Sequence, residues 1–196
     1  SYHDELNEIS NGFNDEVLKE LVRVLKKINL YIFCSKGQIY ELLHFFKNIQ
    51  NVNYEVLTWH KTNPVPTCNN KYLSDTEYLL FFREKGVKIY GTYETKKKYY
   101  VTATNKEDKK LYNHPTVKPL FILENLVQNS SNENDIVLDC FVGSGSTGVA
   151  AKNLNRRFIG IEKDEKYFNI AKQRIQGTII KSIEKEENKM LKLPGM

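Results

Sequence analysis

The chain has 196 residues, of which 40% are hydrophobic and 27% are charged, a composition typical of one globular domain with a buried core. No apolar run approaches the ~18 residues that a membrane-spanning helix needs, and residues 1–5 carry no basic or apolar leader, which argues against a secretion signal. Cys34, Cys68 and Cys140 lie far apart without a CxxC pair, so a disulfide framework and a zinc site are disfavoured and a reducing cytoplasm is expected. The net charge of +5 is a mild indication of a polyanionic partner.

Helix and strand patterns alternate through the first half of the chain. Asn14 or Asp15 is the predicted N-cap of the first helix, which has one apolar face. Pro64 and Pro66 lack backbone N–H donors, so the segment around them is predicted as a loop. The elements expected here are a helix over 14–27, a buried strand over 30–34 suited to a parallel sheet, a helix over 39–46, and strands over 54–61 and 77–82.

The alternation continues in the second half, where Pro119 begins one predicted helix and Asp164 caps another. The elements expected are weak strands near 88–90 and 99–102, a helix over 119–127, a strand over 136–140, a helix over 147–154, a strand over 157–162 and a helix over 164–175. This order predicts an α/β fold with a mainly parallel sheet. No repeat or linker is present, so residues 1–196 are interpreted as a single domain and the basic, tyrosine-rich segment 84–114 as a small insertion within it.

A glycine-rich turn after the 136–140 strand is the strongest local signal. Gly143, Gly145 and Gly148 have the GxGxxG spacing, and Glu162 follows Gly143 by 19 positions, at the end of the next predicted strand. Glycines at a strand-to-helix turn let a ligand approach the backbone closely, and an acid on the next strand can accept hydrogen bonds from a ribose. The pattern therefore predicts a site for a ribose-containing cofactor.

Two classes of enzyme share this pattern, those that use a nicotinamide dinucleotide and methyltransferases. Asp139 and Phe141 precede the first glycine, and an acid there suits the ammonium of a methionine moiety better than a pyrophosphate. Only 34 residues follow Glu162, too few for the second half of a dinucleotide fold. Both features favour the methyltransferase, and a glycine turn without a ligand is disfavoured by the matched acid.

The segment before the glycine strand carries a resemblance to a known family. HPTVKP at 114–119, followed by VLDCFVGSGSTGVAAKNLNRRFIGIEKDEKYFNIAKQRI at 137–175, resembles β-class DNA amino-methyltransferases, and segments 31–35, 59–66 and 77–83 resemble strands of the same class. The resemblance covers about residues 14–176. It implies a Rossmann-like methyltransferase fold with helices on both faces of the sheet, and S-adenosylmethionine as the cofactor.

The resemblance assigns a role to each matching residue. Asp139, Phe141, Gly143 and Gly145 would surround the methionine part of the cofactor, and Glu162 would hold the ribose hydroxyls. The same cofactor site would include Ser146 and Thr147, and its methionine side would be closed by Thr116, Lys118 and Pro119. Phe141 could instead be a core residue and Lys118 a surface charge. Cys140 stands where the family often has proline, and no functional consequence is expected.

The family's catalytic motif, a polar or acidic residue followed by Pro-Pro and an aromatic, is absent from this sequence, which contains no Pro-Pro pair. In the family, the motif accepts the hydrogens of an exocyclic amine and stacks on a base that has been flipped out of the duplex. It also ends a central strand. The chain is therefore expected to be preceded by roughly 30–45 residues, about one strand with its connection and loop, or to be a remnant. No catalytic residue is assigned.

The resemblance places segment 84–114 at the family's target-recognition position, where lysines among tyrosines suit phosphate contact and base stacking. It also places Lys61 and Asn63 on the side of the target base. The candidate contacts to double-stranded DNA are therefore lysines and one asparagine. They are Lys61, Asn63, Lys96, Lys97, Lys98, Lys109 and Lys110. A solvated, lysine-rich surface is the alternative.

The reaction expected is methyl transfer to adenine N6, as in a restriction–modification system. Cytosine N4 and a catalytically dead cofactor- or DNA-binding remnant remain alternatives, and a small-molecule or RNA methyltransferase is less favoured because HPTVKP and the motif order match DNA enzymes. The family also implies a possible homodimer.

Overall fold

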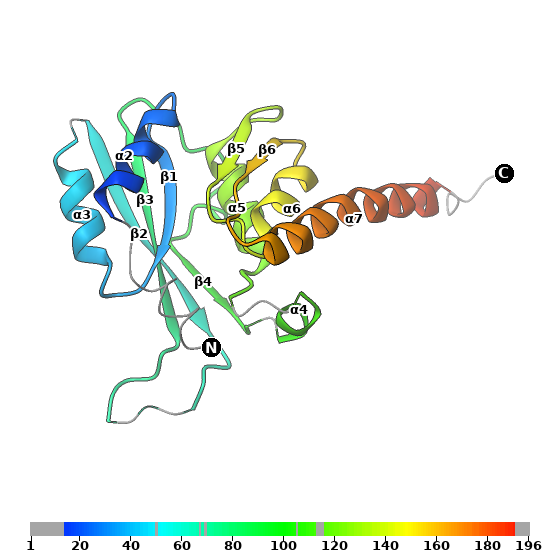
Figure 1. Cartoon of the computed structure of the whole chain (residues 1–196), viewed down its shortest axis with the longest axis horizontal. Coiled ribbons are helices and arrows are strands. Elements are labelled where there is room, and N and C mark those ends of the chain that lie inside the picture. Colours follow the sequence, from blue (N-terminus) through cyan, green and yellow to red (C-terminus); the bar gives the residue numbers. More distant parts are fainter. Residues whose placement is uncertain are drawn as a thin grey trace. The chain divides into compact units, whose positions relative to one another are not determined.

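The computed structural model describes residues 14–49, 51–66, 68, 70–104, 106–112 and 116–190, and it describes residues 107, 111 and 178–190 by their backbone alone. These residues form two compact units (Figure 1). The first unit contains residues up to 88 together with 97–103, and the second contains 89–96 and the residues from 104 onward. Each unit is described by itself below.

The first unit is built on a four-stranded sheet with the order β1-β3-β2-β4. Its elements are α2 (Asp15–Val24), β1 (Asn29–Cys34), α3 (Ile39–Lys47), β2 (Val52–Lys61), β3 (Thr76–Glu84) and β4 (Tyr99–Thr102). Strand β3 lies between β1 and β2 and is antiparallel to both, whereas β4 pairs with β2 in parallel. Strand β3 therefore has two ladder partners and is buried on both faces, with Leu79 and Phe81 on one face and Leu80 and Phe82 on the other.

Helices α2 and α3 cover one face of this sheet. Leu18 of α2 and Leu42 and Phe46 of α3 share a buried cluster with Leu80 and Phe82 of β3. The rings of Phe46 and Phe82 stack with their centroids 3.9 Å apart. Because apolar residues recur at helical spacing on α2 and α3, both helices can bury a continuous stripe against the sheet.

Replacing Leu80 with alanine is expected to lower the free energy of unfolding by about 2–5 kcal/mol, because the side chain is 0% exposed and its removal leaves a cavity. Leu73 is the matched control: it is 44% exposed, so the same substitution there should change stability by no more than about 0.5 kcal/mol. Urea denaturation of both variants measures the difference. Equal effects at the two positions would contradict the assignment of Leu80 to the core.

The second unit contains a two-stranded parallel sheet and its helices (Figure 1). Its elements are α4 (Lys106–Leu111), α5 (Leu120–Ser130), β5 (Ile136–Asp139), α6 (Ser146–Asn153), β6 (Arg157–Gly160) and α7 (Glu165–Met190). Helix α6 contacts both strands, and it also contacts α5 and α7. Gly148 makes this packing possible, because a Cβ there would lie 2.4 Å from Cδ1 of Ile175 in α7.

The predicted α/β class is confirmed, and nearly all predicted elements are present. The Asn14 side chain caps α2 by accepting a hydrogen bond from the Val17 N–H at 2.9 Å, and Pro119 precedes α5 as predicted. The parallel pairing suggested for the 30–34 strand is wrong, because β3 lies between β1 and β2 and pairs antiparallel with each. The prediction of a mainly parallel sheet is therefore wrong for the four-stranded sheet, where β2 and β4 form the parallel pair, whereas β5 and β6 do pair in parallel. Helix α7 continues past residue 175 to Met190. Among the described helices, none is both long and apolar enough to cross a bilayer.

Segment 84–114 is divided between the two units. The strand predicted near 99–102 is present as β4, whereas the weak strand predicted at 88–90 is wrong. There the Tyr90 N–H donates to the carbonyl of Asn129 in α5 at 2.7 Å instead of joining a ladder. Asn125 and Asn129 also donate to the Thr95 carbonyl, so residues 90–95 are tied to α5. Helix α4 was not predicted; the interpretation of 84–114 as one insertion stays a prediction.

Candidate functional site

The site is built where β5 and β6 end. These strands are parallel, with Asp139 beside Gly160, so the segments that follow them leave the sheet at the same edge. Ligands of open α/β sheets bind outside the carboxyl ends of the strands. Residues 140–145 connect β5 to α6 and residues 161–164 connect β6 to α7, and we call the first of these connections the cofactor loop.

The backbone of the cofactor loop has the conformation that its glycines allow. Gly143 has φ 51° and Gly145 has φ 82°, both in the left-handed region that glycine adopts without a Cβ clash. Asp139 begins the turn, because its Oδ1 accepts a hydrogen bond from the Phe141 N–H at 2.9 Å. A Cβ at Gly145 would lie 3.0 Å from Cα of Ala171, so this glycine also lets the loop approach α7.

Glu162 connects the two loops through its carboxylate. Oε2 accepts a hydrogen bond from the Gly143 N–H at 2.7 Å, and Oε1 accepts one from the Asp164 N–H at 3.0 Å. Asp164 in turn accepts a hydrogen bond from the Tyr167 N–H and so caps α7, as predicted. A carboxylate has about four lone-pair positions. Glu162 can therefore fix the loop and still accept hydrogen bonds from two neighbouring hydroxyls, which is what a bound ribose requires.

Phe141 and Cys140 differ in their surroundings. Phe141 is 57% exposed, so the alternative that it fills the core is excluded. Cys140 is half-buried, and burial together with the nearby Asp139 carboxylate raises the pKa of its thiol. The Cys140 side chain is therefore uncharged near neutral pH, and Asp139 is the acidic group at the start of the loop.

The predicted pocket-edge residues lie before α5. Pro119 is buried, and its carbonyl accepts hydrogen bonds from the N–H groups of Ile122 and Leu123 in the first turn of α5. Thr116 and Lys118 are half-buried on either side of Val117, which is 1% exposed. The first two residues of HPTVKP lie outside the described residues. The contact of Thr116, Lys118 and Pro119 with a cofactor stays a prediction.

Comparison with known proteins shows the family of this chain. The sequence model of the DNA methylase family matches residues 3–173. The chain belongs to the DNA methylase family. The resemblance to DNA amino-methyltransferases, drawn from HPTVKP and the glycine loop, is thereby confirmed. The β-class arrangement and the catalytic segment expected upstream of residue 1 stay predictions.

Two curated relatives of this methylase chain are Type II methyltransferases. The chain is 36% identical over 184 residues to M2.LlaDCHI of Lactococcus lactis subsp. cremoris, an alignment that covers 86% of this chain and 68% of the relative. It is 37% identical over 174 residues to M2.DpnII of Streptococcus pneumoniae, with 82% of this chain and 63% of the relative covered. The methylase chain thus spans about two thirds of the length of these curated relatives.

A solved structure of a related methylase has the same fold. The crystal structure of M1.HpyAVI in complex with S-adenosylmethionine is 35% identical to this chain, with a TM-score of 0.64 and 74% of each chain covered. The predicted Rossmann-like methyltransferase fold is confirmed by this likeness.

The candidate DNA contacts of the methylase occupy several environments. Lys61 forms an ion pair with Glu77 at 2.8 Å and lies 5.3 Å from the centroid of the Trp59 ring, and Lys98 pairs with Glu55. Asn63, Lys97 and Lys109 are half-buried, whereas Lys96 and Lys110 are exposed. Lys61 and Lys98 are therefore already partly neutralised by carboxylates. The assignment of these residues to DNA stays a prediction.

A residue that contacts the cofactor loop was missed by the sequence analysis. Arg174 of α7 donates hydrogen bonds to the carbonyl and Oγ of Ser144 and to Oγ of Ser146. The Ser146 hydroxyl, predicted to contact the cofactor, is thus already engaged within the protein. The sequence does carry a signal for Arg174. At helical spacing, a residue three positions after Ala171 shares its face of the helix, so Arg174 is a charged residue on the face of α7 that buries Ala171.

Proposed function

We propose that this chain is the cofactor-binding part of an S-adenosylmethionine-dependent methyltransferase that modifies adenine N6 in double-stranded DNA. The observation that carries the proposal is the Glu162 carboxylate, which joins the Gly143 and Asp164 N–H groups at the ends of two parallel strands. This arrangement fits a ribose diol beside a loop whose backbone a ligand can approach. The family and the relatives named above support DNA as the substrate.

The proposal assigns roles to residues in and around the cofactor loop. Glu162 accepts hydrogen bonds from the ribose hydroxyls, and Asp139 attracts the ammonium of the methionine moiety. The exposed Phe141 ring covers the methionine side, together with Thr116, Lys118 and Pro119. Gly143, Gly145 and Thr147 let the backbone approach the ligand at the start of α6. When bound, S-adenosylmethionine supplies a methyl group that its sulfonium makes electrophilic.

The reaction is tested with labelled S-adenosylmethionine and unmethylated DNA, followed by identification of the modified nucleoside. The chain is assayed beside a form that includes any coding sequence upstream of Ser1. N6-methyladenine from either form supports the proposal, and N4-methylcytosine would replace adenine by cytosine as the target. Cofactor binding without product from either form would favour a binding protein instead of an enzyme.

Replacing Phe141 with alanine is expected to weaken S-adenosylmethionine binding by about tenfold, which corresponds to ~1.4 kcal/mol of lost apolar contact. The melting temperature should not change, because the ring is 57% exposed and contributes little to the core. Phe168 of α7 is the matched control, since it is 47% exposed and lies outside the proposed contacts. Calorimetric titration measures both variants. A loss at Phe168 equal to that at Phe141 would contradict the assignment.

Replacing Lys109 and Lys110 together with glutamine is expected to weaken DNA binding and to reduce the slope of log affinity against log salt by about 2, since each phosphate contact contributes ~0.9. Lys36 and Lys47 are exposed lysines outside the predicted set, so their double replacement is a control with the same charge change. Fluorescence anisotropy over a salt series provides the measurement. Identical slopes for the two double variants would show a general charge effect.

The proposal extends to a homodimer in the cytoplasm. The resemblance implies the dimer, and the free thiols of Cys34, Cys68 and Cys140 are consistent with a reducing compartment. Analytical ultracentrifugation tests the dimer directly: a single species of monomer mass across the concentrations used would remove it from the proposal.

A further inference from the structure

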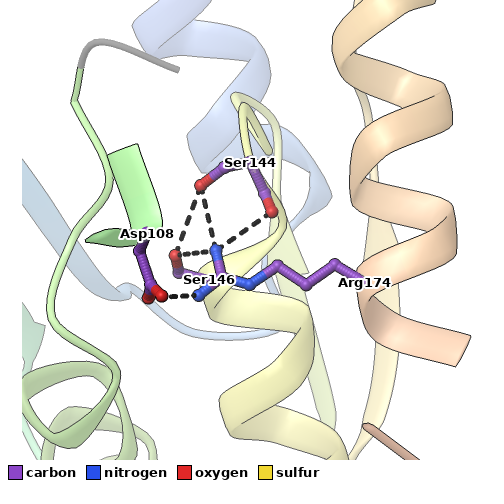
Figure 2. Close-up of polar contacts among 4 residues, drawn as sticks. All are labelled: Asp108, Ser144, Ser146 and Arg174. Carbon is purple, nitrogen blue, oxygen red and sulfur yellow. Dashed lines mark hydrogen bonds and ion pairs between the residues drawn. The ribbon is translucent and has the colours of Figure 1, made fainter. Parts of the chain in front are cut away.

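Arg174 is a largely buried charge that joins two separate segments of the second unit. Its side chain is 6% exposed and extends from α7 toward the cofactor loop and α4 (Figure 2). Burying a guanidinium is unfavourable unless hydrogen bonds and opposite charge compensate for lost hydration. We therefore expect the positions of Arg174 and of its hydrogen-bonding partners to depend strongly on one another.

On one side, Arg174 holds the cofactor loop. Its Nη1 lies 3.1 Å from the Ser144 carbonyl oxygen, 3.1 Å from Ser144 Oγ and 2.8 Å from Ser146 Oγ. The amino group has two hydrogens for these three acceptors, so at least one hydrogen bond is shared. Ser144 lies between Gly143 and Gly145, so Arg174 contacts the loop between the residues whose positive φ angles form its turn.

On the other side, Arg174 holds α4. Its Nη2 lies 3.4 Å from Oδ2 of Asp108, and the guanidinium carbon lies 4.1 Å from the centroid of the Tyr112 ring. Burial lowers the pKa of Arg174, whereas Tyr112 and Asp108 raise it. An arginine remains protonated under such opposing influences. The carboxylate and the ring thus compensate the charge that the serines of the loop cannot neutralise.

We propose that Arg174 is a positioning residue that couples α4 to the cofactor loop, so that a change at α4 changes the affinity for S-adenosylmethionine. The inference rests on the proposed function, since it assigns this loop to the cofactor. The contacts that support it all lie within the second unit. If Asp108 moves, the guanidinium loses its carboxylate, and its hydrogen bonds to Ser144 and Ser146 rearrange with it.

The coupling has a consequence for DNA, because Asp108 shares the six-residue helix α4 with Lys109 and Lys110, two proposed phosphate contacts. Phosphates bound there would act on Asp108 and, through Arg174, on the cofactor loop. Thermodynamic linkage requires the reverse effect to be equal, so the bound cofactor would change DNA affinity by the same factor.

A double-mutant cycle tests the coupling. The variants are Asp108→Asn, Arg174→Met and the pair, and calorimetric titration measures their affinity for S-adenosylmethionine. Asp108→Asn is expected to weaken binding by at least about fivefold, the lower end of typical couplings between sites. It should have little further effect when Arg174 is already methionine. Glu133→Gln is the matched control, since Glu133 is an exposed carboxylate of the same unit, and Arg174→Lys should retain part of the affinity.

Unchanged binding by Asp108→Asn, or additive effects in the pair, would overturn the proposal. Failure of the wild-type protein to bind S-adenosylmethionine would instead contradict the proposed function. Hydrogen exchange separates the two cases without any cofactor: Asp108→Asn should accelerate exchange of the amides at 143–147, and Glu133→Gln should not. Unaltered exchange there would overturn the coupling on its own.

Discussion

Replacing Glu162 with glutamine is expected to weaken S-adenosylmethionine binding by at least about tenfold. A hydrogen bond to a charged group contributes ~1.5–3 kcal/mol, and the carboxylate is proposed to make two of them to the ribose. The two carboxylate oxygens of Glu162 accept hydrogen bonds from the N–H groups of Gly143 and Asp164. Glutamine has the same size but one acceptor oxygen, so its amide nitrogen would face one of these two N–H groups. Calorimetric titration of the variant measures the loss.

Glu165 provides the matched control for this experiment. It is an exposed acid in the first turn of α7, three positions after Glu162, so Glu165→Gln removes the same charge without touching the loop. Its affinity should match that of the wild type. Equal affinities for all three proteins would mean that Glu162 does not contact the cofactor.

Replacing Gly145 with valine is expected to destabilise the second unit by about 2–5 kcal/mol. The left-handed backbone costs roughly 1–2 kcal/mol for a residue with a Cβ, and forcing atoms into packed space costs about 1–3 kcal/mol more. Both conditions hold, since Gly145 has φ 82° and a Cβ there would lie 3.0 Å from Cα of Ala171. Urea denaturation followed by circular dichroism measures the change.

Gly177 is the control for a glycine without such constraints. It lies within α7, and a Cβ there would meet no atom within 4 Å. Gly177→Ala should therefore stabilise the protein by about 0.5–1 kcal/mol, because alanine loses less conformational freedom in a helix. Destabilisation by both substitutions to the same degree would contradict the packing described for Gly145.

The elements that could be predicted from sequence are those that carry a local chemical signal. Asn14 and Asp164 are capping residues whose side chains accept N–H groups in the first turns of α2 and α7. The spacing of Gly143, Gly145 and Glu162 predicted a turn and a matched acid, and the structure joins Gly143 to Glu162. In both cases the identity and spacing of a few residues indicate the geometry.

The features that could not be predicted depend on residues far apart in sequence. Nothing in the local sequence of β1 specifies that β3 will lie between β1 and β2. The antiparallel pairing of these strands could therefore be determined only from the structure. The same holds for Arg174, whose partners Ser144 and Asp108 lie 30 and 66 positions away. Tyr90 is a further example, because its sequence resembles a strand but its N–H donates a hydrogen bond to the Asn129 carbonyl of α5.

The central claim is that the loop after β5 binds S-adenosylmethionine and not a dinucleotide. Separate calorimetric titrations of the protein with S-adenosylmethionine and with NAD⁺ test it most directly. We expect saturable binding of S-adenosylmethionine at one site per chain and no heat from NAD⁺. Saturable binding of NAD⁺, with none of S-adenosylmethionine, would contradict the claim.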